Sequence, residues 1–447
     1  MLGSNKQRVC LSLVGMLALG GGSAVAHVAP LPHKIYVGSC YFPSSPTIQA
    51  AINGVASGGE VAVCPGIYPE QVTINQPVTL TGITNGTASA AVVVPPAAGL
   101  ATNASDIFGN PVSAQIFVEN ATAVTIENLT VDGVGNNIVG CVPTTFEGIY
   151  FQNSSGKIQH NTVRNQYQTD IADYGGCQNG LAINVESLTT ASVVTVSANS
   201  VRAFQKNGIT ATGSATGTGA PGPIVTISGN YIVGLGATAL NWLPSAPAAE
   251  NGIQFSYGAT GTVTQNTVND TIWGPDTSAD TGDAASGILV YASQGININD
   301  NKVNSAQFSI VAVSDPTYGT ADGTIVSTNY IAGTQIFDAI DLCSNSNTAR
   351  SNTIYGSTES GIHIDDTCGT SNNNVVTSNN INEGCAGILE GATSTGNTIS
   401  SNTFYNVVTT ILSGDTCTLP SYAPAARSAA PRSHKALRPS PYNPMRR

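Results

Sequence analysis

The sequence is poor in charge, in methionine and in tryptophan. Asp, Glu, Lys and Arg make up 9% of its 447 residues, against about 25% in an ordinary globular protein. There are three Met and two Trp, and no long stretch has clear helical periodicity. Gly, Asn, Ser, Thr and Val are abundant instead, and these residues form turns and strands. The composition therefore disfavours a helical fold and indicates a β-rich chain.

Basic residues are scarce in the body of the chain. Seven Lys or Arg lie between residues 27 and 417, whereas all 26 Asp and Glu lie at or before Asp415. Such an acidic body is a poor partner for nucleic acid. Residues 418–447 are rich in Pro, Ala, Ser and Arg. We expect a disordered basic tail there, either a solvated end or a tether to an anionic cell envelope.

Residues 1–26 are typical of a signal peptide. Lys6 and Arg8 supply a positive start, a short apolar run ends at Leu19, and Ala24-Val25-Ala26 is a small-residue cleavage site. An uncleaved anchor is the alternative, but this run is too short to span a bilayer, and no later segment is long and apolar enough. We expect a secreted protein, or one in the periplasm or on the cell surface, without a transmembrane segment.

A short pattern recurs along the chain: an Ile or Val, two other residues, an Asn, one more residue, and an Ile, Val or Phe. The pattern occurs nine times, and only the repeat at Asn352 departs from it, at its first position. The nine asparagines are 23 to 38 residues apart: Asn161, Asn199, Asn230, Asn266, Asn301, Asn329, Asn352, Asn379 and Asn402. Partner segments beginning with Gly-Ile or a near equivalent recur between them. Such periods indicate a solenoid, which grows along one axis where a compact core would divide into domains.

The spacing predicts a bend at each asparagine. Side chains three before and two after it cannot both face inward from one straight strand, because a strand alternates with period two. Asn tolerates the left-handed conformation that such a bend needs. Equivalent asparagines would then stack into a hydrogen-bonded ladder, with parallel strands about 4.8 Å apart.

Residues 46–56 are expected to form a short helix over the open end of the first coil, which would otherwise expose a sheet edge. Pro46 suits the first helical position. Apolar residues follow at helical spacing: Ile48, Ala51, Ile52 and Val55.

The segment SPTIQAAINGVASGGEVAVCPGIYPEQVTI resembles the start of right-handed β-helix proteins of the pectin-lyase-like superfamily, especially its NosD-like and carbohydrate-binding branch. The resemblance extends over about residues 35–415 and implies fold rather than activity, because this superfamily includes lyases, hydrolases, esterases, epimerases, tailspikes and proteins without known activity. We expect an all-β fold, a right-handed parallel β-helix of roughly 10–12 coils with a short N-terminal capping helix, in residues 27–417.

Eight cysteines remain once Cys10 is removed with the signal peptide. An even count in an exported chain favours disulfides, and the absence of a CxxC pair disfavours zinc. The repeat register suggests four pairs, the last by elimination: Cys40–Cys64, Cys141–Cys177, Cys343–Cys368 and Cys385–Cys417.

Three long loops follow Asn161, Asn230 and Asn266. There, 19, 22 and 21 residues separate the Asn from the next Gly-Ile or Gly-Leu segment, against 8 to 10 in most coils. All three loops leave the solenoid at the same turn, so we expect them to border one face of it. Long loops on a rigid scaffold often carry the functional residues. Their aromatic rings suit sugars and their carboxylates suit Ca²⁺. The alternative is that each Trp packs its own loop onto the coils beneath. The candidates are Tyr167, Tyr174, Trp242 and Trp273 for sugar and Asp276, Asp280 and Asp283 for Ca²⁺.

Arg164 and Arg202 each lie three residues after a repeat asparagine and should point outward from adjacent coils. Two like charges about 5 Å apart repel by roughly 3 kcal/mol at an effective dielectric near 20, so we expect Asp170 and Asp173 to offset them, with Lys206 as a third cation. The group is either a structural ion-pair network or a site where Arg neutralises a uronate and Lys206 or an Arg abstracts its proton.

The segment GIHIDD holds a second candidate. Ile362 and Ile364 should face inward, so His363 and Asp365 face outward, with Asp341 in register one coil earlier. An outward His between carboxylates is either an acid–base group or a surface ion pair, and we favour the latter.

Several enzyme motifs of the superfamily are missing. We find no polygalacturonase-like motif set, no pectin-methylesterase-like Asp-Phe-Ile-Phe-Gly and no Asp-Pro-His segment like that of alginate epimerases. The leading hypothesis is therefore an exported β-helix protein that binds polysaccharide or cell-envelope glycan on the loop-walled face. The alternatives are a uronate lyase or epimerase, and a non-catalytic structural or adhesive surface protein.

Overall fold

The computed structural model describes residues 30–84, 91–106, 108–141, 144–171, 177, 179–187, 190–214, 222–236, 250–272, 283–333, 337–417 and 438–439. The predicted signal peptide and most of the predicted tail lie outside these residues. No helix in the described part of the chain has the length and apolarity of a membrane span.

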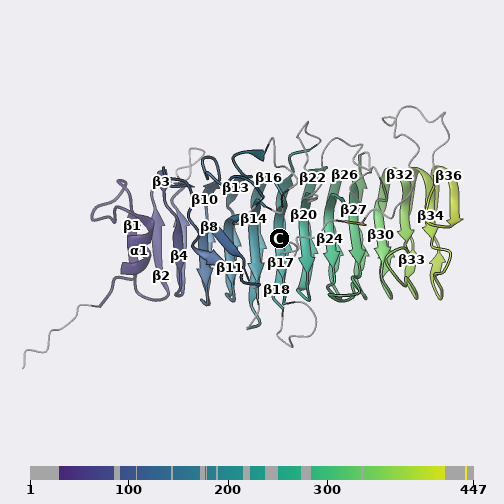
Figure 1. Cartoon of the computed structure of the whole chain (residues 1–447), viewed down its shortest axis with the longest axis horizontal. Coiled ribbons are helices and arrows are strands. Elements are labelled where there is room, and N and C mark those ends of the chain that lie inside the picture. The colour runs from purple at the N-terminus through teal and green to yellow at the C-terminus, as the bar shows by residue number, and fades with distance from the viewer. Residues whose placement is uncertain are drawn as a thin grey trace, which may run out of the picture. The chain divides into compact units, whose positions relative to one another are not determined.

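Parallel strands dominate the described residues, which confirms the expected right-handed parallel β-helix (Figure 1). The first face of the solenoid is a 13-stranded sheet. Its strands are β1 (Lys34–Val37), β2 (Gly59–Val63), β5 (Val78–Gly82), β9 (Val124–Glu127), β12 (Gly156–Gln159), β15 (Val193–Ser197), β18 (Ile224–Ser228), β21 (Thr260–Thr264), β25 (Asn297–Asn299), β28 (Ile325–Ser327), β31 (Thr348–Arg350), β33 (Val375–Thr377) and β35 (Thr398–Ser400). β1 precedes the helix and the other twelve each begin a coil, within the range expected.

The remaining strands form a 22-stranded sheet that bends into two faces. The second face contains β3 (Gly66–Pro69), β6 (Ala91–Val94), β10 (Leu129–Asp132), β13 (Thr162–Gln166), β16 (Ser200–Phe204), β19 (Tyr231–Val233), β22 (Thr267–Thr271), β26 (Lys302–Ala306) and β29 (Tyr330–Ala332). The third face contains β4 (Val72–Ile74), β7 (Ala104–Ser105), β8 (Pro111–Glu119), β11 (Thr145–Gln152), β14 (Leu181–Glu186), β17 (Asn207–Thr212), β20 (Asn251–Ser256), β24 (Ser286–Tyr291), β27 (Phe308–Val313) and β30 (Ile340–Cys343). In the last coils, single long strands run through both the second and the third face: β32 (Thr353–Ile364), β34 (Asn380–Glu390) and β36 (Thr403–Ser413).

The core is built from columns of aliphatic side chains that repeat in register from coil to coil. One column on the third face consists of isoleucines, paired strand by strand: Ile116, Ile149, Ile183, Ile209, Ile253, Ile288, Ile310, Ile340, Ile362, Ile388 and Ile411. All but Ile411 are buried. Because strand side chains alternate, their neighbours in sequence point away from this core.

The nine repeat asparagines hydrogen-bond in series between the first and second faces. Asn301, for example, accepts from the backbone N (2.9 Å) and Nδ2 (3.0 Å) of Asn266 and donates to Oδ1 of Asn329 (3.0 Å). The left-handed residue is the one before each asparagine, with φ between 54° and 63°, and not the asparagine itself. The expected bend exists, but the asparagine amide is used for hydrogen bonding rather than for its backbone tolerance.

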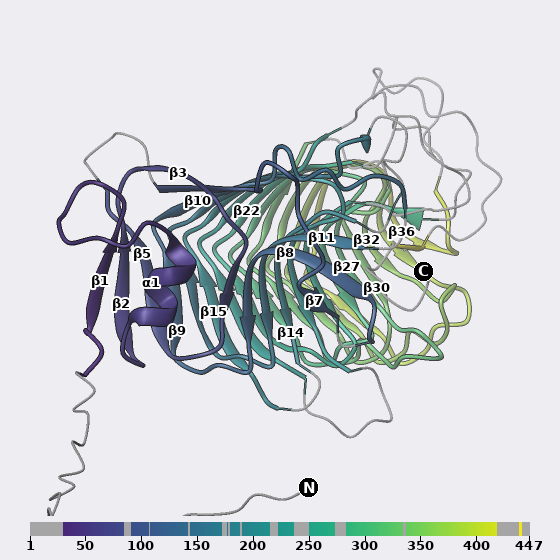
Figure 2. The same ribbon diagram turned by 60° about the vertical axis from the view of Figure 1, so that its left-hand side comes forward.

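Helix α1 (Ile48–Gly54) packs against β1, β2 and β4 at the N-terminal end of the coils (Figure 2). It begins two residues later than expected, because Thr47 is the N-cap and accepts from the backbone N of Ala50. Pro46 therefore precedes the cap. The carboxylate of Glu70 accepts from the backbone N of Ile48 and Gln49, at 2.9 and 3.1 Å, and satisfies two further helix donors.

Four disulfides pair the eight cysteines as the repeat register suggests. They are Cys40–Cys64, Cys141–Cys177, Cys343–Cys368 and Cys385–Cys417, with Cα–Cα distances of 5.0 to 5.9 Å. A separate two-stranded sheet pairs β23 (Asp283–Ala284) with β37 (Arg438–Pro439). Two residues of the predicted tail therefore pair with the third long loop.

Candidate functional site

The three long loops are anchored at one edge of the solenoid. They connect β13 to β14, β19 to β20 and β22 to β24, the same second-face to third-face turn in three coils. Most of their candidate residues lie outside the described residues: Asp173, Tyr174, Trp242, Trp273, Asp276 and Asp280. Only the backbone of Asp283 is described, in β23. Tyr167 is half-buried, and its carbonyl oxygen accepts from Nδ2 of Asn136.

Arg164 and Arg202 pair in register on β13 and β16, both exposed. The partner of Arg164 differs from the expected one. Its Nε donates to Oδ2 of Asp132 at 2.8 Å, because Asp132 occupies the same register one coil earlier. Asp170 instead accepts from the backbone N of Gly140 and from Nε2 of Gln168. The structure therefore replaces the predicted Arg–Asp170 pair with Arg164–Asp132.

Lys206 is fully buried in the turn before β17, whereas Arg202 is exposed on β16. Lys206 interacts electrostatically with Glu250, which is also buried. Burial raises the pKa of Glu250 well above its usual value, while hydrogen bonds from the backbone of Leu235 and Ile272, and the Lys206 charge, partly oppose this. These contacts place Lys206 in a buried polar setting and apart from the exposed arginine pair.

Exposed tyrosines occupy the second face, a feature that the sequence interpretation missed. Tyr231, Tyr330, Tyr355 and Tyr405 have between 39% and 58% of their surface exposed. The rings of Tyr330 and Tyr355 lie 5.7 Å apart between centroids. Each tyrosine lies one or three residues after a stacked asparagine, so the signal was present in the segments NYI, NTIY and NTFY.

His363 and Asp341 pair in register on β32 and β30, as expected. Their setting differs from the surface ion pair that we favoured, because Asp338, Asp341, His363 and Asp365 are only 3% to 7% exposed. The partner of His363 is Asp338, whose Oδ2 lies 3.2 Å from Nδ1. Asp338 was missed, although it precedes the Ala-Ile pair of its coil in FDAIDL. Nε2 of His363 lies 3.9 Å from Oδ1 of Asp415, which follows β36.

Burial and mutual repulsion perturb the carboxyl groups around His363. Burial, followed by the charge of Asp365, raises the pKa of Asp341 well above its usual value. Burial, followed by the charge of Asp338, raises the pKa of Glu359 to about 8. For His363, burial acts to lower the pKa, but the charge and hydrogen bond of Asp338 raise it overall. Clusters of this kind are typical of functional sites.

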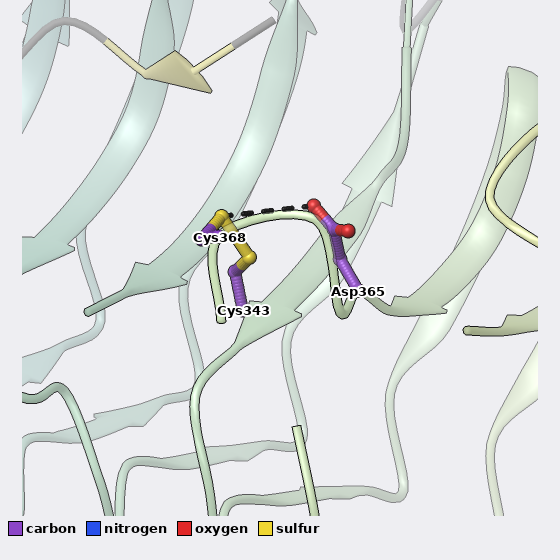
Figure 3. A group of neighbouring side chains, drawn as sticks. All are labelled: Cys343, Asp365 and Cys368. Carbon is purple, nitrogen blue, oxygen red and sulfur yellow. Dashed lines mark hydrogen bonds between the residues drawn. A yellow bond between two sulfur atoms is a disulfide. The ribbon is translucent and has the colours of Figure 1, made fainter. Parts of the chain in front are cut away.

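Three groups of side chains in this region bring possible metal ligands within 4.8 Å of one another. They are Cys343–Asp365–Cys368, Asp341–His363–Asp365 and Asp365–Asp366–Asp415. The first cannot bind as thiolates, because its cysteines form a disulfide (Figure 3). The 3.8 Å contact between Sγ of Cys368 and Oδ2 of Asp365 is not a hydrogen bond, since a disulfide sulfur carries no proton. The other two groups share Asp365.

A further buried polar cluster lies on the third face of the early coils. Nδ2 of Asn184 donates to Oε1 of Glu147 (3.0 Å) and to Oε1 of Glu186 (3.1 Å), and the Tyr150 hydroxyl donates to Oε2 of Glu186. The amide of Asn184 donates to both carboxylates, so these side chains form one buried hydrogen-bonded network.

Comparison with known proteins agrees with this fold. The family described as "Periplasmic copper-binding protein (NosD)" matches residues 244–419. None of the curated proteins matches the chain. Among solved structures, the GH136 lacto-N-biosidase from Eubacterium ramulus is similar at 14% identity, with 83% of this chain and 68% of that chain covered and a TM-score of 0.56.

The Dettilon tailspike protein is similar at 13% identity, with 84% of this chain and 68% of that chain covered and a TM-score of 0.57. Identities this low carry information on the fold alone. The coil register, the parallel sheets and these neighbours together identify the chain as a right-handed parallel β-helix protein with a NosD-like region at residues 244–419.

Proposed function

We propose that this is an exported protein that binds polysaccharide along the second face of its β-helix. The observation that carries the proposal is the set of exposed tyrosines on that face, Tyr231, Tyr330, Tyr355 and Tyr405. A tyrosine ring offers a flat apolar surface with a polar edge, which suits the face of a sugar ring and its hydroxyl groups.

The register of the tyrosines supports an extended ligand that runs across the strands. Tyr355 pairs with Asn382 and Asn382 pairs with Tyr405, so an amide separates two rings along one column. Tyr330 lies beside Lys302 in the neighbouring column. Adjacent parallel strands are about 4.8 Å apart, so the Asn382 amide lies one strand spacing from each of the two rings of its column, Tyr355 and Tyr405.

Export is supported by the predicted signal peptide and by the four disulfides. Disulfides persist in oxidising compartments and are rare in the cytosol. The periplasm, the cell surface and the medium all meet this requirement.

The test is a titration of the mature, disulfide-intact protein with soluble neutral and uronate polysaccharides, read by calorimetry and by melting temperature. Tyr355→Ala should weaken binding about tenfold, the ratio that corresponds to a loss of about 1.4 kcal/mol. The matched control is Tyr41→Ala, because Tyr41 is also exposed but lies before helix α1, away from the second face. Equal affinities for wild type, Tyr355→Ala and Tyr330→Ala would refute the tyrosine surface.

The enzymatic alternative is a uronate lyase or epimerase in which Arg164 and Arg202, exposed and paired in register, bind the uronate, with Ca²⁺ at Asp276, Asp280 and Asp283. Lys206 has no part in it, because its side chain is fully buried. If the protein is a lyase, ultraviolet absorbance from an unsaturated uronate should rise during the same titration. The Arg202→Ala variant should not produce this rise. A protein that neither binds nor cleaves would favour the structural or adhesive alternative, in which the basic tail matters most.

A further inference from the structure

The region around His363 combines side chains from three parts of the fold. Asp341 comes from β30, His363 from β32, and Asp365 from the turn directly after β32. One possible ligand atom of each lies within 4.8 Å of the others. Asp415, from the segment after β36, approaches Nε2 of His363 to 3.9 Å and is about one-third exposed, so the region has an opening toward solvent.

Three buried polar atoms in this group have no hydrogen-bond partner among the described residues. They are Oδ1 of Asp341, Nε2 of His363 and Oδ1 of Asp415. Asp341 and His363 are more than nine-tenths buried. An unpaired buried polar or charged atom is costly, and in proteins such atoms are usually satisfied by a partner or by a metal ion.

The second nitrogen of the imidazole is held as it is in metal-binding histidines. Nδ1 of His363 lies 3.2 Å from Oδ2 of Asp338, and Oδ1 of Asp338 accepts from the Ser360 hydroxyl at 2.6 Å. A histidine that binds a metal through one nitrogen commonly donates the other N–H to a carboxylate, which sets the ring orientation. Asp338 therefore acts as a positioning residue.

Two disulfides restrain the segments that carry these side chains. Cys343–Cys368 joins β30 to the turn after β32, and its cysteines lie two and three residues from Asp341 and Asp365 (Figure 3). Cys385–Cys417 ties the segment containing Asp415 to β34. Preorganised ligands of this kind lower the cost of binding.

We propose that Asp341, His363 and Asp365, with Asp415 as the fourth ligand, form a binding site for one divalent first-row transition ion such as Mn²⁺ or Zn²⁺. Carboxylate oxygens suit Mn²⁺ and an imidazole nitrogen suits Zn²⁺ and its neighbours. The imidazole distinguishes this site from an all-oxygen Ca²⁺ site. Asp366 is not assigned as a ligand, because it does not belong to the group that contains His363. Oδ1 and Oδ2 of Asp365 accept from the backbone N and the hydroxyl of Thr367, at 2.7 and 2.9 Å, and each oxygen keeps a second lone pair for a metal ion.

The experiment uses the mature, disulfide-intact protein after treatment with a chelator and buffer exchange. Mn²⁺ is titrated with electron paramagnetic resonance detection of the free ion, and Zn²⁺ and Ca²⁺ are titrated by calorimetry. We expect one Mn²⁺ or Zn²⁺ per chain. Asp338→Asn should weaken affinity about 10–100-fold, as loss of an outer-sphere carboxylate does, and Asp341→Asn and His363→Gln should weaken it further.

Asp300→Asn is the matched control, because Asp300 is exposed in another turn and Asn keeps its carbonyl oxygen for the Thr328 hydroxyl. The metal-free Asp341→Asn variant should fold, because Asn has the size of the buried carboxyl group and carries no charge; its melting temperature checks this directly. The proposal is overturned if no stoichiometric binding occurs, if Asp341→Asn and His363→Gln both retain it, or if only Ca²⁺ binds. Glycan titration of the metal-free protein tests the tyrosine surface separately.

Discussion

The backbone of single residues sets the bend in each coil. The position before the stacked asparagine is left-handed in every case, yet its occupants include His160, Ala198, Gly229, Gln265 and Thr328. A left-handed residue with a Cβ costs roughly 1–2 kcal/mol. The hydrogen bonds made by the side-chain amide of the following asparagine offset that cost, because they also fix the backbone of the neighbouring coil.

Ala198 and Gly229 occupy this position in consecutive coils and allow a reciprocal test. Ala198→Gly should stabilise the fold by about 0.5–1 kcal/mol, because relief of the left-handed strain exceeds the extra entropy lost by glycine. Gly229→Ala should destabilise it by about 1 kcal/mol, since no atom lies within 4 Å of the added Cβ and only backbone strain changes. Urea unfolding measures both, and changes of the same sign would contradict the assignment.

Elements in this fold acquire stability from their neighbours one coil away. Each stacked asparagine accepts from the backbone of the preceding coil, and all except Asn402 also donate to the asparagine of the following coil. The hydrogen bonds of one coil are therefore completed by its neighbours. All nine are buried except Asn402, which is half-buried in the last coil. Helix α1 likewise depends on another segment, because the backbone N–H groups of Ile48 and Gln49 donate to the carboxylate of Glu70.

Asn301→Ala should lower the free energy of unfolding by about 2–5 kcal/mol, because it leaves the backbone N of Asn266 and the carbonyl of Val263 buried without partners. Asn402→Ala should cost about 1 kcal/mol, since water can reach the exposed end of the series. Equilibrium unfolding in urea compares the two variants. Equal losses would show that the interior position has no special dependence on its amide.

At the scale of the whole molecule, the two ends of the solenoid differ. Helix α1 covers the first coil, and inward-facing residues of the first coils such as Val61, Val72 and Leu80 are fully buried. In the last coil, Ile411 continues the isoleucine column but is 47% exposed, and Val408 is 56% exposed. The coils form a nearly one-dimensional array in which each contacts only its neighbours.

Hydrogen exchange should therefore be fastest at the C-terminal end of the array. Backbone amides of β35 and β36 have a coil on one side only, so they should exchange well before those of β21 and β22, measured by mass spectrometry on the oxidised protein. Reduction of Cys385–Cys417 should increase this difference. Uniform protection from β21 to β36 would mean that another element covers the last coil.

Much of the register was readable from the sequence, because the Asn pattern and its Gly-Ile partners recur from Asn161 onward and an aliphatic residue placed off the core face would be exposed. The later coils and the disulfides between them follow from that periodicity, whereas the capping helix follows from its own helical spacing. The outward side chains obey no such pattern, so their partners depend on which coils are adjacent and on the path of the loops. Only the tertiary structure places Asp132 beside Arg164, buries His363 with Asp338 and brings Asp415 to it from the last coil, because these contacts join segments 25 to 52 residues apart.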